Sequence, residues 1–188
     1  MHKKIFKKYY FIDQFNKSYI DNQDKNTTII YRNYNKNYKI DEIILIRNYC
    51  RRKGLKFILA NNIKLSIQLN LDGAYLPSFN KYFSHLSYKL RKNFIFIGSA
   101  HSLKEIKIKE RQEVKEIFIS SIFKKNKNFL GINKFNLIST YSQKKIIALG
   151  GITEENLKLL RLTKSIGFAG ISFFVNKKKA PKKGPFLK

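Results

Sequence analysis

The sequence has little cysteine and no long apolar run. Cys50 is the only cysteine among 188 residues, which excludes an intrachain disulfide and a cysteine cluster for a metal. No stretch approaches the roughly 18 consecutive apolar residues of a membrane-spanning helix. The basic segment 1–8 is followed by an apolar run that Asp13 and Gln14 interrupt. These absences predict a protein of the reducing cytoplasm that does not associate with a membrane.

Acidic residues are also scarce. The chain has 12 Asp and Glu against 39 Lys and Arg, a formal net charge of +27 that attracts nucleic acid, anionic lipid or phosphorylated ligands. The lysines are scattered among asparagine and isoleucine, without a compact basic motif or a known nucleic-acid module. This distribution favours a general drift of the composition toward Lys, Asn and Ile over a dedicated binding surface. Nucleic-acid binding is therefore expected to be at most weak and non-specific.

The most complete pattern lies near the carboxyl end. An apolar strand over Ile146–Leu149 leads into Gly150-Gly151, and Thr153 follows as the cap of an expected helix. Gly167 is expected to end that helix before a second apolar strand over Phe168–Phe174. This order predicts a parallel β/α crossover. The two glycines either let backbone N–H groups approach a phosphate or simply allow a tight turn.

Apolar segments of strand length alternate with helical patterns along the whole chain, which predicts an α/β fold with a parallel sheet. A clear helix is expected over Asp41–Lys53, ending at Gly54, whereas the polar segment Gln14–Thr27 has room for only one or two helical turns. The lysine-rich tail 177–188 has no apolar periodicity. The expected strands are Tyr9–Ile12, Thr28–Arg32, Leu55–Leu59, Gly73–Leu76, Phe94–Gly98, Glu116–Ser120, Ile146–Leu149 and Phe168–Phe174.

Several spaced motifs resemble one family. The segments Ile147–Asn156 and Gly167–Ile171 closely resemble the last two β/α units of the thiamine phosphate synthase and TenI (thiazole tautomerase) family. Leu71–Leu76 resembles its fourth-strand signature, with Tyr75 in place of a histidine, and Ile97–Ser102 is similar to its Gly-x-Ser-x-His-Ser element. The resemblance implies a short (β/α)8 TIM barrel over residues 1–176, with a reduced first crossover and a basic tail over 177–188.

The resemblance also implies an activity in thiamine biosynthesis. Enzymes of this family join an aminopyrimidine pyrophosphate to a thiazole phosphate and release pyrophosphate. The departing pyrophosphate carries several negative charges, which Mg²⁺ and basic residues neutralise. Arg32 matches the family's second-strand arginine, and Asp72 matches one of its two metal-binding aspartates. Asn61 and Tyr34 stand where the family has the other aspartate and a lysine, so a weakened activity is expected.

The remaining site residues follow from the same resemblance. Ser99 is expected to hydrogen-bond the substrate. Lys125 and Lys127 either contact the pyrophosphate or are solvated loop residues. The expected thiazole phosphate site is shaped by three glycines, which are Gly150, Gly151 and Gly170.

His101 has two interpretations. At the barrel mouth it can move protons, as the tautomerase branch requires, or it caps the following helix and bonds within its loop. We expect Arg32, Asp72, Ser99, His101 and Gly151 to converge at the carboxyl-terminal mouth of the barrel.

Two alternatives stay open at this point. One is a thiazole tautomerase-like enzyme that uses His101. The other is a barrel without catalysis that binds a phosphorylated ligand or nucleic acid. The replaced metal aspartate argues against full synthase activity, whereas the retained glycine turns argue against a purely structural remnant.

Overall fold

A computed structural model describes residues 6–34 and 39–176, and the expected basic tail 177–188 lies outside the described residues. Its centre is a closed barrel in which each strand pairs in parallel with the next and β8 pairs with β1. The predicted TIM barrel is therefore confirmed. The strands are β1 (Lys7–Ile12), β2 (Thr27–Tyr31), β3 (Lys56–Ala60), β4 (Gly73–Leu76), β5 (Ile95–Ala100), β6 (Glu116–Ser120), β7 (Lys145–Leu149) and β8 (Gly167–Gly170).

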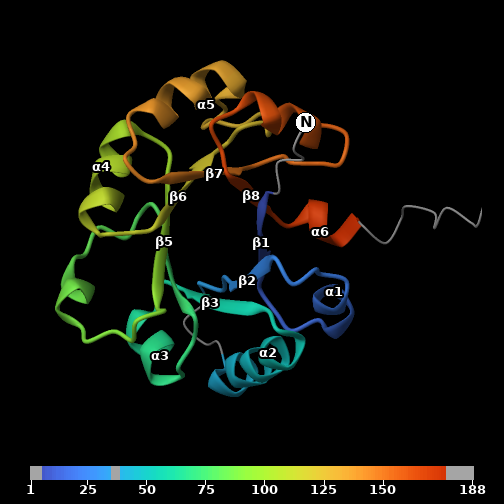
Figure 1. The fold of residues 1–188 in the computed structure, drawn as a ribbon, viewed down its shortest axis with the longest axis vertical. Coiled ribbons are helices and arrows are strands. Elements are labelled where there is room, and N and C mark those ends of the chain that lie inside the picture. The colour runs from blue at the N-terminus through green and yellow to red at the C-terminus, as the bar shows by residue number, and fades with distance from the viewer. Residues whose placement is uncertain (1–5, 35–38, 177–188) are drawn as a thin grey trace, which may run out of the picture.

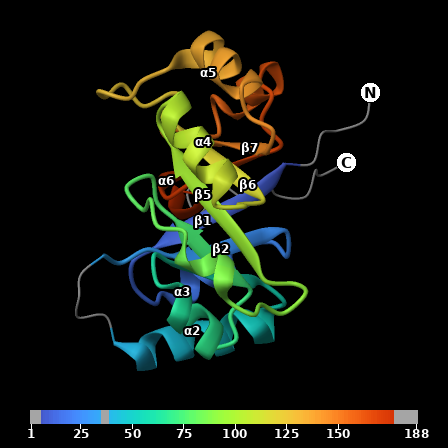
Figure 2. The same ribbon diagram turned by 90° about the vertical axis from the view of Figure 1, so that its left-hand side faces the viewer.

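The helices lie outside the ring of strands (Figures 1 and 2). The first crossover holds only the five-residue α1, as its short polar sequence predicted. Within residues 6–34 and 39–176, no helix combines the length and the apolar character that crossing a membrane requires. The helices are α1 (Lys17–Asp21), α2 (Ile40–Lys53), α3 (Ile63–Gln68), α4 (Leu103–Arg111), α5 (Gly131–Thr140) and α6 (Ser172–Asn176), with 3₁₀ helices η1 (Ser84–Ser87) and η2 (Leu157–Leu162).

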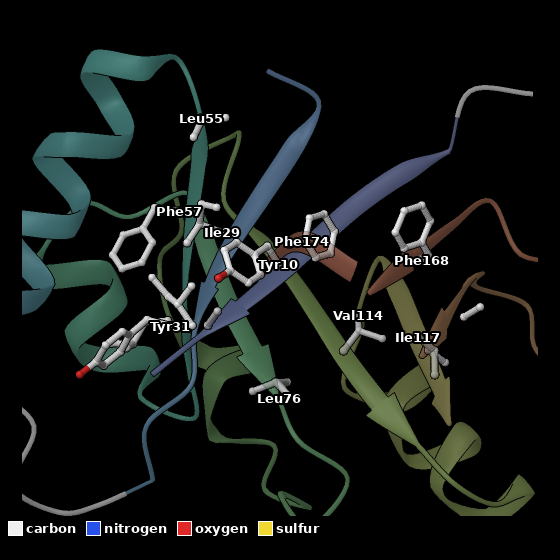
Figure 3. Close-up of a cluster of buried hydrophobic side chains, with 14 of the residues drawn as sticks. Tyr10, Ile29, Tyr31, Leu55, Phe57, Leu76, Val114, Ile117, Phe168 and Phe174 are labelled. Atoms are coloured by element: carbon white, nitrogen blue, oxygen red, sulfur yellow. The ribbon is translucent and has the colours of Figure 1, made fainter. Parts of the chain in front are cut away.

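Alternate residues of each strand face two separate cores, because side chains along a strand point to opposite sides. One core lies between the strands and the helices and contains Tyr10, Phe57 and Phe168 (Figure 3). The other fills the barrel interior, where the rings of Phe11 and Tyr75 lie 5.4 Å apart and each contacts Phe118. The interior is therefore packed with side chains, and ligands have access only at its ends.

The amino-terminal end of the barrel is closed by a polar contact. Glu116 begins β6 and is buried, and its carboxylate accepts hydrogen bonds from the Tyr9 hydroxyl and the Lys7 ammonium. Burial, and secondarily the charge of Glu116, raise the pKa of Tyr9, which stays a neutral donor. A buried carboxylate needs such partners, so this contact belongs to the stability of the barrel.

The last expected strand is shorter than predicted. Only Gly167–Gly170 is β8, and Ser172–Asn176 forms α6, so the expected strand over Phe168–Phe174 is wrong in its second half. Phe173 and Phe174 are consecutive and both buried, which a helix packed on the core and a strand buried on both faces allow equally well. The apolar run alone could not distinguish the two.

The segment after the glycine turn also differs from its prediction. Thr153 bonds reciprocally with Asn156, but the helix that follows is the 3₁₀ helix η2, and of its leucines Leu160 is buried while Leu162 is exposed. Gly167 does not end a helix but begins β8, where a Cβ would lie 2.8 Å from the Cβ of Lys7. The glycine is required there because β1 passes so close.

Candidate active site

The expected site residues come from seven loops and strand ends, and most of them share one end of the barrel. In a parallel barrel the carboxyl ends of all strands meet at the same mouth. Arg32 and Asn61 directly follow β2 and β3, Ser99 lies near the end of β5, and His101 follows it. The other mouth residues are Lys125 and Lys127 after β6, Gly150 and Gly151 after β7, and Gly170 at the end of β8.

Arg32 lies at the edge of a mouth cavity of about 170 Å³, which is also lined by Asp13, Ile171 and Val175. Its guanidinium stacks over the Phe11 ring at 4.6 Å from the ring centroid, and its backbone N–H donates to the Ile12 carbonyl at 2.7 Å. The side chain is only partly buried. Arg32 is thus held by an aromatic ring, and within residues 6–34 and 39–176 its guanidinium forms no ion pair that would compete with an anion.

Ser99 and Tyr75 form a buried pair inside the mouth. Ser99 is only 4% exposed, and Tyr75 is 3% exposed. Burial raises the pKa of Tyr75, while a hydrogen bond with Ser99 and the charge of Arg32 act in the opposite direction. The Tyr75 phenol therefore stays neutral, and its hydrogen bond engages the Ser99 hydroxyl. Tyr75, which stands in place of the family's histidine, brings a hydrogen-bonding group into the centre of the site.

His101 is fixed on both sides. Its backbone N–H donates to Glu105 Oε2 at 2.6 Å, and Ser102 caps α4 by accepting from the Glu105 N–H. Its ring Nδ1 lies 3.1 Å from the Ser120 carbonyl and 3.0 Å from the Ser120 hydroxyl. Because a carbonyl only accepts, this geometry assigns the proton to Nδ1 and leaves the lone pair on Nε2. The contacts therefore agree with the cap and loop interpretation of His101, whereas proton transfer at Nε2 stays a prediction.

The glycine turn after β7 packs against the loop after β6. Gly150 and Gly151 have φ of 103° and 73°, in the region that disfavours other residues. A Cβ at Gly150 would lie 3.0 Å from the Ser121 Cβ, and one at Gly151 would lie 2.9 Å from the Lys124 Cα. The glycines thus serve a tight turn and a close loop contact, which is the simpler of the two interpretations. A phosphate-binding role stays a prediction.

Lys125 and Lys127 are exposed in the loop after β6. The loop is closed by two backbone hydrogen bonds, in which the Ser121 N–H donates to the Asn128 carbonyl at 2.8 Å and the Leu130 N–H donates to the Ser121 carbonyl at 2.9 Å. Gly170 is partly exposed, and a Cβ there would have no atom within 4 Å. The two lysines thus lie in the loop whose Lys124 contacts the glycine turn, and Gly170 leaves open space at the end of β8.

Asp72 does not lie at the mouth, so the expected convergence is wrong for this residue. It immediately precedes β4, at the amino-terminal end of the barrel. Its carboxylate accepts from the Phe57 N–H at 2.8 Å and lies 3.9 Å from Arg91. Asp72 therefore joins the starts of β3 and β4 and is at the opposite end of the barrel from Gly151.

The donor set at the mouth does not fit Mg²⁺. The Asn61 side-chain oxygen accepts a hydrogen bond of 2.8 Å from the amide of Asn80, so a neutral amide pair occupies this position. Mg²⁺ prefers carboxylate oxygens, and Asp72 is at the far end. Among the described residues, no group of three or more His, Cys, Asp or Glu is placed to hold a metal ion.

Comparison with known proteins identifies the family. The family model described as thiamine monophosphate synthase matches residues 20–174. The chain belongs to this family. It is 27% identical over 134 residues to the putative thiamine-phosphate synthase 2 of Aquifex aeolicus, covering 69% of this chain and 72% of that relative. It is 26% identical over 149 residues to the thiamine-phosphate synthase of Limosilactobacillus reuteri, covering 76% and 69%.

The fold of the family is also found among solved structures. The thiamine phosphate pyrophosphorylase of Pyrococcus furiosus superposes with a TM-score of 0.73 at 21% identity, covering 89% of this chain and 86% of that chain. This likeness bears on the fold alone. Together with the family match, the named relatives identify a thiamine phosphate synthase-like protein of thiamine biosynthesis, of the transferase class.

Sequence reasoning missed three residues that shape the mouth, namely Asn80, Lys109 and Gln112. Lys109 follows Ile106 by three residues, and both are buried on the inner face of α4. That helical spacing was visible in the sequence and could have marked Lys109 as a buried cation. Nothing in the sequence marked Asn80, whose partner Asn61 is 19 residues away.

Proposed function

We propose that this protein catalyses the joining of an aminopyrimidine pyrophosphate to a thiazole phosphate at the carboxyl-terminal mouth, at a rate well below that of relatives with a complete charged site. The observation that carries the proposal is the family match over residues 20–174. We place the reaction in the cytoplasm.

Each proposed role follows from a group at the mouth. Arg32 binds the pyrophosphate, because its guanidinium is held by Phe11 and has no ion-pair partner among the residues that the structure describes. The neutral phenol of Tyr75, bonded to Ser99, orients the substrate from below. Lys125 and Lys127 approach the leaving group from the loop after β6. Gly150 and Gly151 leave backbone N–H groups close to the thiazole phosphate, and Gly170 leaves room beside it.

The reduced rate follows from two replaced charges. Asn61 offers a neutral oxygen where a carboxylate would hold a metal, and Tyr34 offers no charge where a lysine would stabilise the departing pyrophosphate. Removing one well-placed stabiliser of transition-state charge commonly costs about 10²- to 10³-fold in rate. Chemistry is thus expected to suffer more than binding.

The test combines turnover with binding. Purified protein is mixed with both substrates, with and without magnesium, and thiamine phosphate is followed, while thiazole phosphate is titrated separately by calorimetry. Binding with slow turnover supports the proposal. A rate normal for the family would show that this mouth compensates for the missing charges. Failure to bind either phosphorylated substrate would favour a non-catalytic barrel.

A second candidate is thiazole tautomerisation, which the geometry of His101 favours. Its ring is oriented by Ser120, and Nε2 has no partner among the residues that the structure describes. A nitrogen of this kind can accept and return a proton. If His101→Gln abolishes tautomer exchange of a thiazole phosphate while leaving its affinity unchanged, this second function is supported.

A further inference from the structure

Lys109 is a buried cation that has no acidic partner at hydrogen-bond distance among the described residues. It lies on α4 and its side chain is fully buried. The ammonium donates hydrogen bonds of 2.8 Å to the Pro77 carbonyl, the Asn80 carbonyl and the Gln112 side-chain oxygen. Burial lowers the pKa of Lys109 to about 8, so the amine is mostly protonated at neutral pH. All three N–H donors are satisfied, which is what a buried charge requires.

The barrel makes room for this lysine. The aliphatic part of Lys109 passes over β5 at Gly98, where a Cβ would lie 2.7 Å from the Lys109 Cδ. The glycine therefore allows the ammonium to reach the loop that follows β4. A lysine that merely needed solvent would not be directed inward across a strand.

Two of the three acceptors of Lys109, the Pro77 and Asn80 carbonyls, belong to the loop over residues 77–82, named here the β4 loop. Gln112 holds the same loop, since its side-chain N–H groups donate to the Tyr82 carbonyl at 2.7 Å and the Asn80 carbonyl at 3.2 Å. The Asn80 side chain in turn donates to Asn61 at 2.8 Å. A continuous set of hydrogen bonds thus runs from the helix to the mouth.

The amide pair is also flanked by aromatic rings. Tyr34 follows β2 and Phe79 lies in the β4 loop, and their ring centroids are 5.4 Å apart. Because β3 lies between β2 and β4, this contact spans the end of the strand that carries Asn61. The loops around the pair are therefore joined to each other without a charged group.

We propose that Lys109 is a positioning residue, which gathers the carbonyl oxygens of the β4 loop and so holds the Asn61–Asn80 amide pair at the mouth without a divalent cation. A metal ion orders loops by collecting their oxygens around one positive centre. The ammonium does the same from beneath the loop. The mouth is organised by a cation that belongs to the chain itself.

The first experiment tests metal binding with Mn²⁺, a paramagnetic ion that takes the same oxygen ligands as Mg²⁺. Free Mn²⁺ is measured by electron paramagnetic resonance during titration of the full chain. The native protein should show no saturable site below millimolar, and Asn61→Asp with Asn80→Asp should create one. A matched control is Asn48→Asp with Asn93→Asp, which adds the same charge at exposed positions. A saturable native site that Asn61→Ala removes, or no gain in the first double variant, overturns the proposal.

The second experiment tests the positioning role by amide hydrogen exchange. Lys109→Met keeps the stem and removes the ammonium, and exchange should rise about 10-fold or more in the β4 loop while β6 and β7 stay protected. Lys104→Met, exposed on the same helix, is the control. If Lys109→Met exchanges everywhere because it does not fold, Gln112→Leu replaces it and should loosen the same loop. Native-like exchange of the β4 loop in a folded variant overturns the proposal.

Neither measurement depends on turnover. Loss of the proposed enzyme activity would leave both results interpretable, and the failure of either expected result can be told apart from the failure of the proposed reaction.

Discussion

The Arg32 guanidinium is supported by an aromatic ring and forms no ion pair with the residues that the structure describes. Its guanidinium lies over Phe11, while its charge faces a mouth cavity. A charged hydrogen bond to a phosphate contributes about 1.5–3 kcal/mol, which corresponds to roughly 10- to 100-fold in affinity. Arg32→Gln should therefore weaken binding of a phosphorylated substrate by about that factor, with little change in melting temperature.

Calorimetric titration of the variant measures this loss. Arg161→Gln is the control, because Arg161 is exposed on η2 and its replacement removes the same charge. An equal loss of affinity in the control would show that the overall charge, and not Arg32, holds the ligand.

The single cysteine is expected to be unreactive in the folded protein. Cys50 is fully buried in α2, and burial raises the pKa of its thiol to about 12. The thiolate is the reactive form, so at pH 8 the native protein should react with a thiol reagent very slowly. Reaction should become fast once denaturant unfolds the chain. A native rate like that of free glutathione would contradict the burial of Cys50.

At the scale of elements, the two glycines of the turn after β7 can be compared with Gly170 at the end of β8. Gly150→Ala and Gly151→Ala combine a strained φ with contacts to Ser121 and Lys124, so each should lower the free energy of unfolding by roughly 1–3 kcal/mol. Gly170→Ala has free space and no positive φ, and it should be nearly neutral. Denaturant titration measures all three. Equal effects at the three positions would mean that the turn is not tight.

The hydrophobic periodicity of the sequence was enough to predict most helices and strands, and it failed for two of them. β4 and β6 begin and end at the expected residues, because short apolar segments between turns have few other solutions. The prediction of one strand over Phe168–Phe174 failed because two adjacent phenylalanines suit a buried strand and a packed helix equally well. The prediction of an α-helix at η2 failed because the three-residue period of a 3₁₀ helix and the 3.6-residue period of an α-helix differ little over six residues.

The site was harder to predict than the fold. Positions directly after strands, such as Arg32 and His101, could be placed at the mouth from the chain order alone. Asp72 was misplaced because a residue before a strand and one after it lie at opposite ends of the barrel. The contact of Lys109 with the β4 loop depends on packing between distant segments, which no local pattern encodes.

At the scale of the whole molecule, the net charge of +27 predicts a weak attraction for nucleic acid. Such binding should be independent of sequence and fall steeply with salt, because counterion release drives it. Fluorescence anisotropy with unrelated oligonucleotides, repeated over a range of salt concentrations, measures both properties. A complex that survives high salt and prefers one sequence would contradict this expectation.

The pairing of β8 with β1 joins the two extremes of the chain. Tyr10 near the start stacks on Phe174 of α6 at 5.0 Å between ring centroids, and Phe174 also stacks on Phe168. During synthesis on the ribosome, β1 leaves the exit tunnel first but lacks its β8 neighbour until residues 167–170 have followed. At a translation rate of about 5–20 residues per second, the chain between β1 and β8 takes roughly 8–30 s to make, and the first strand has one side unpaired during that time. The ring can thus close only after β8 has been synthesised, however early the other strands pair.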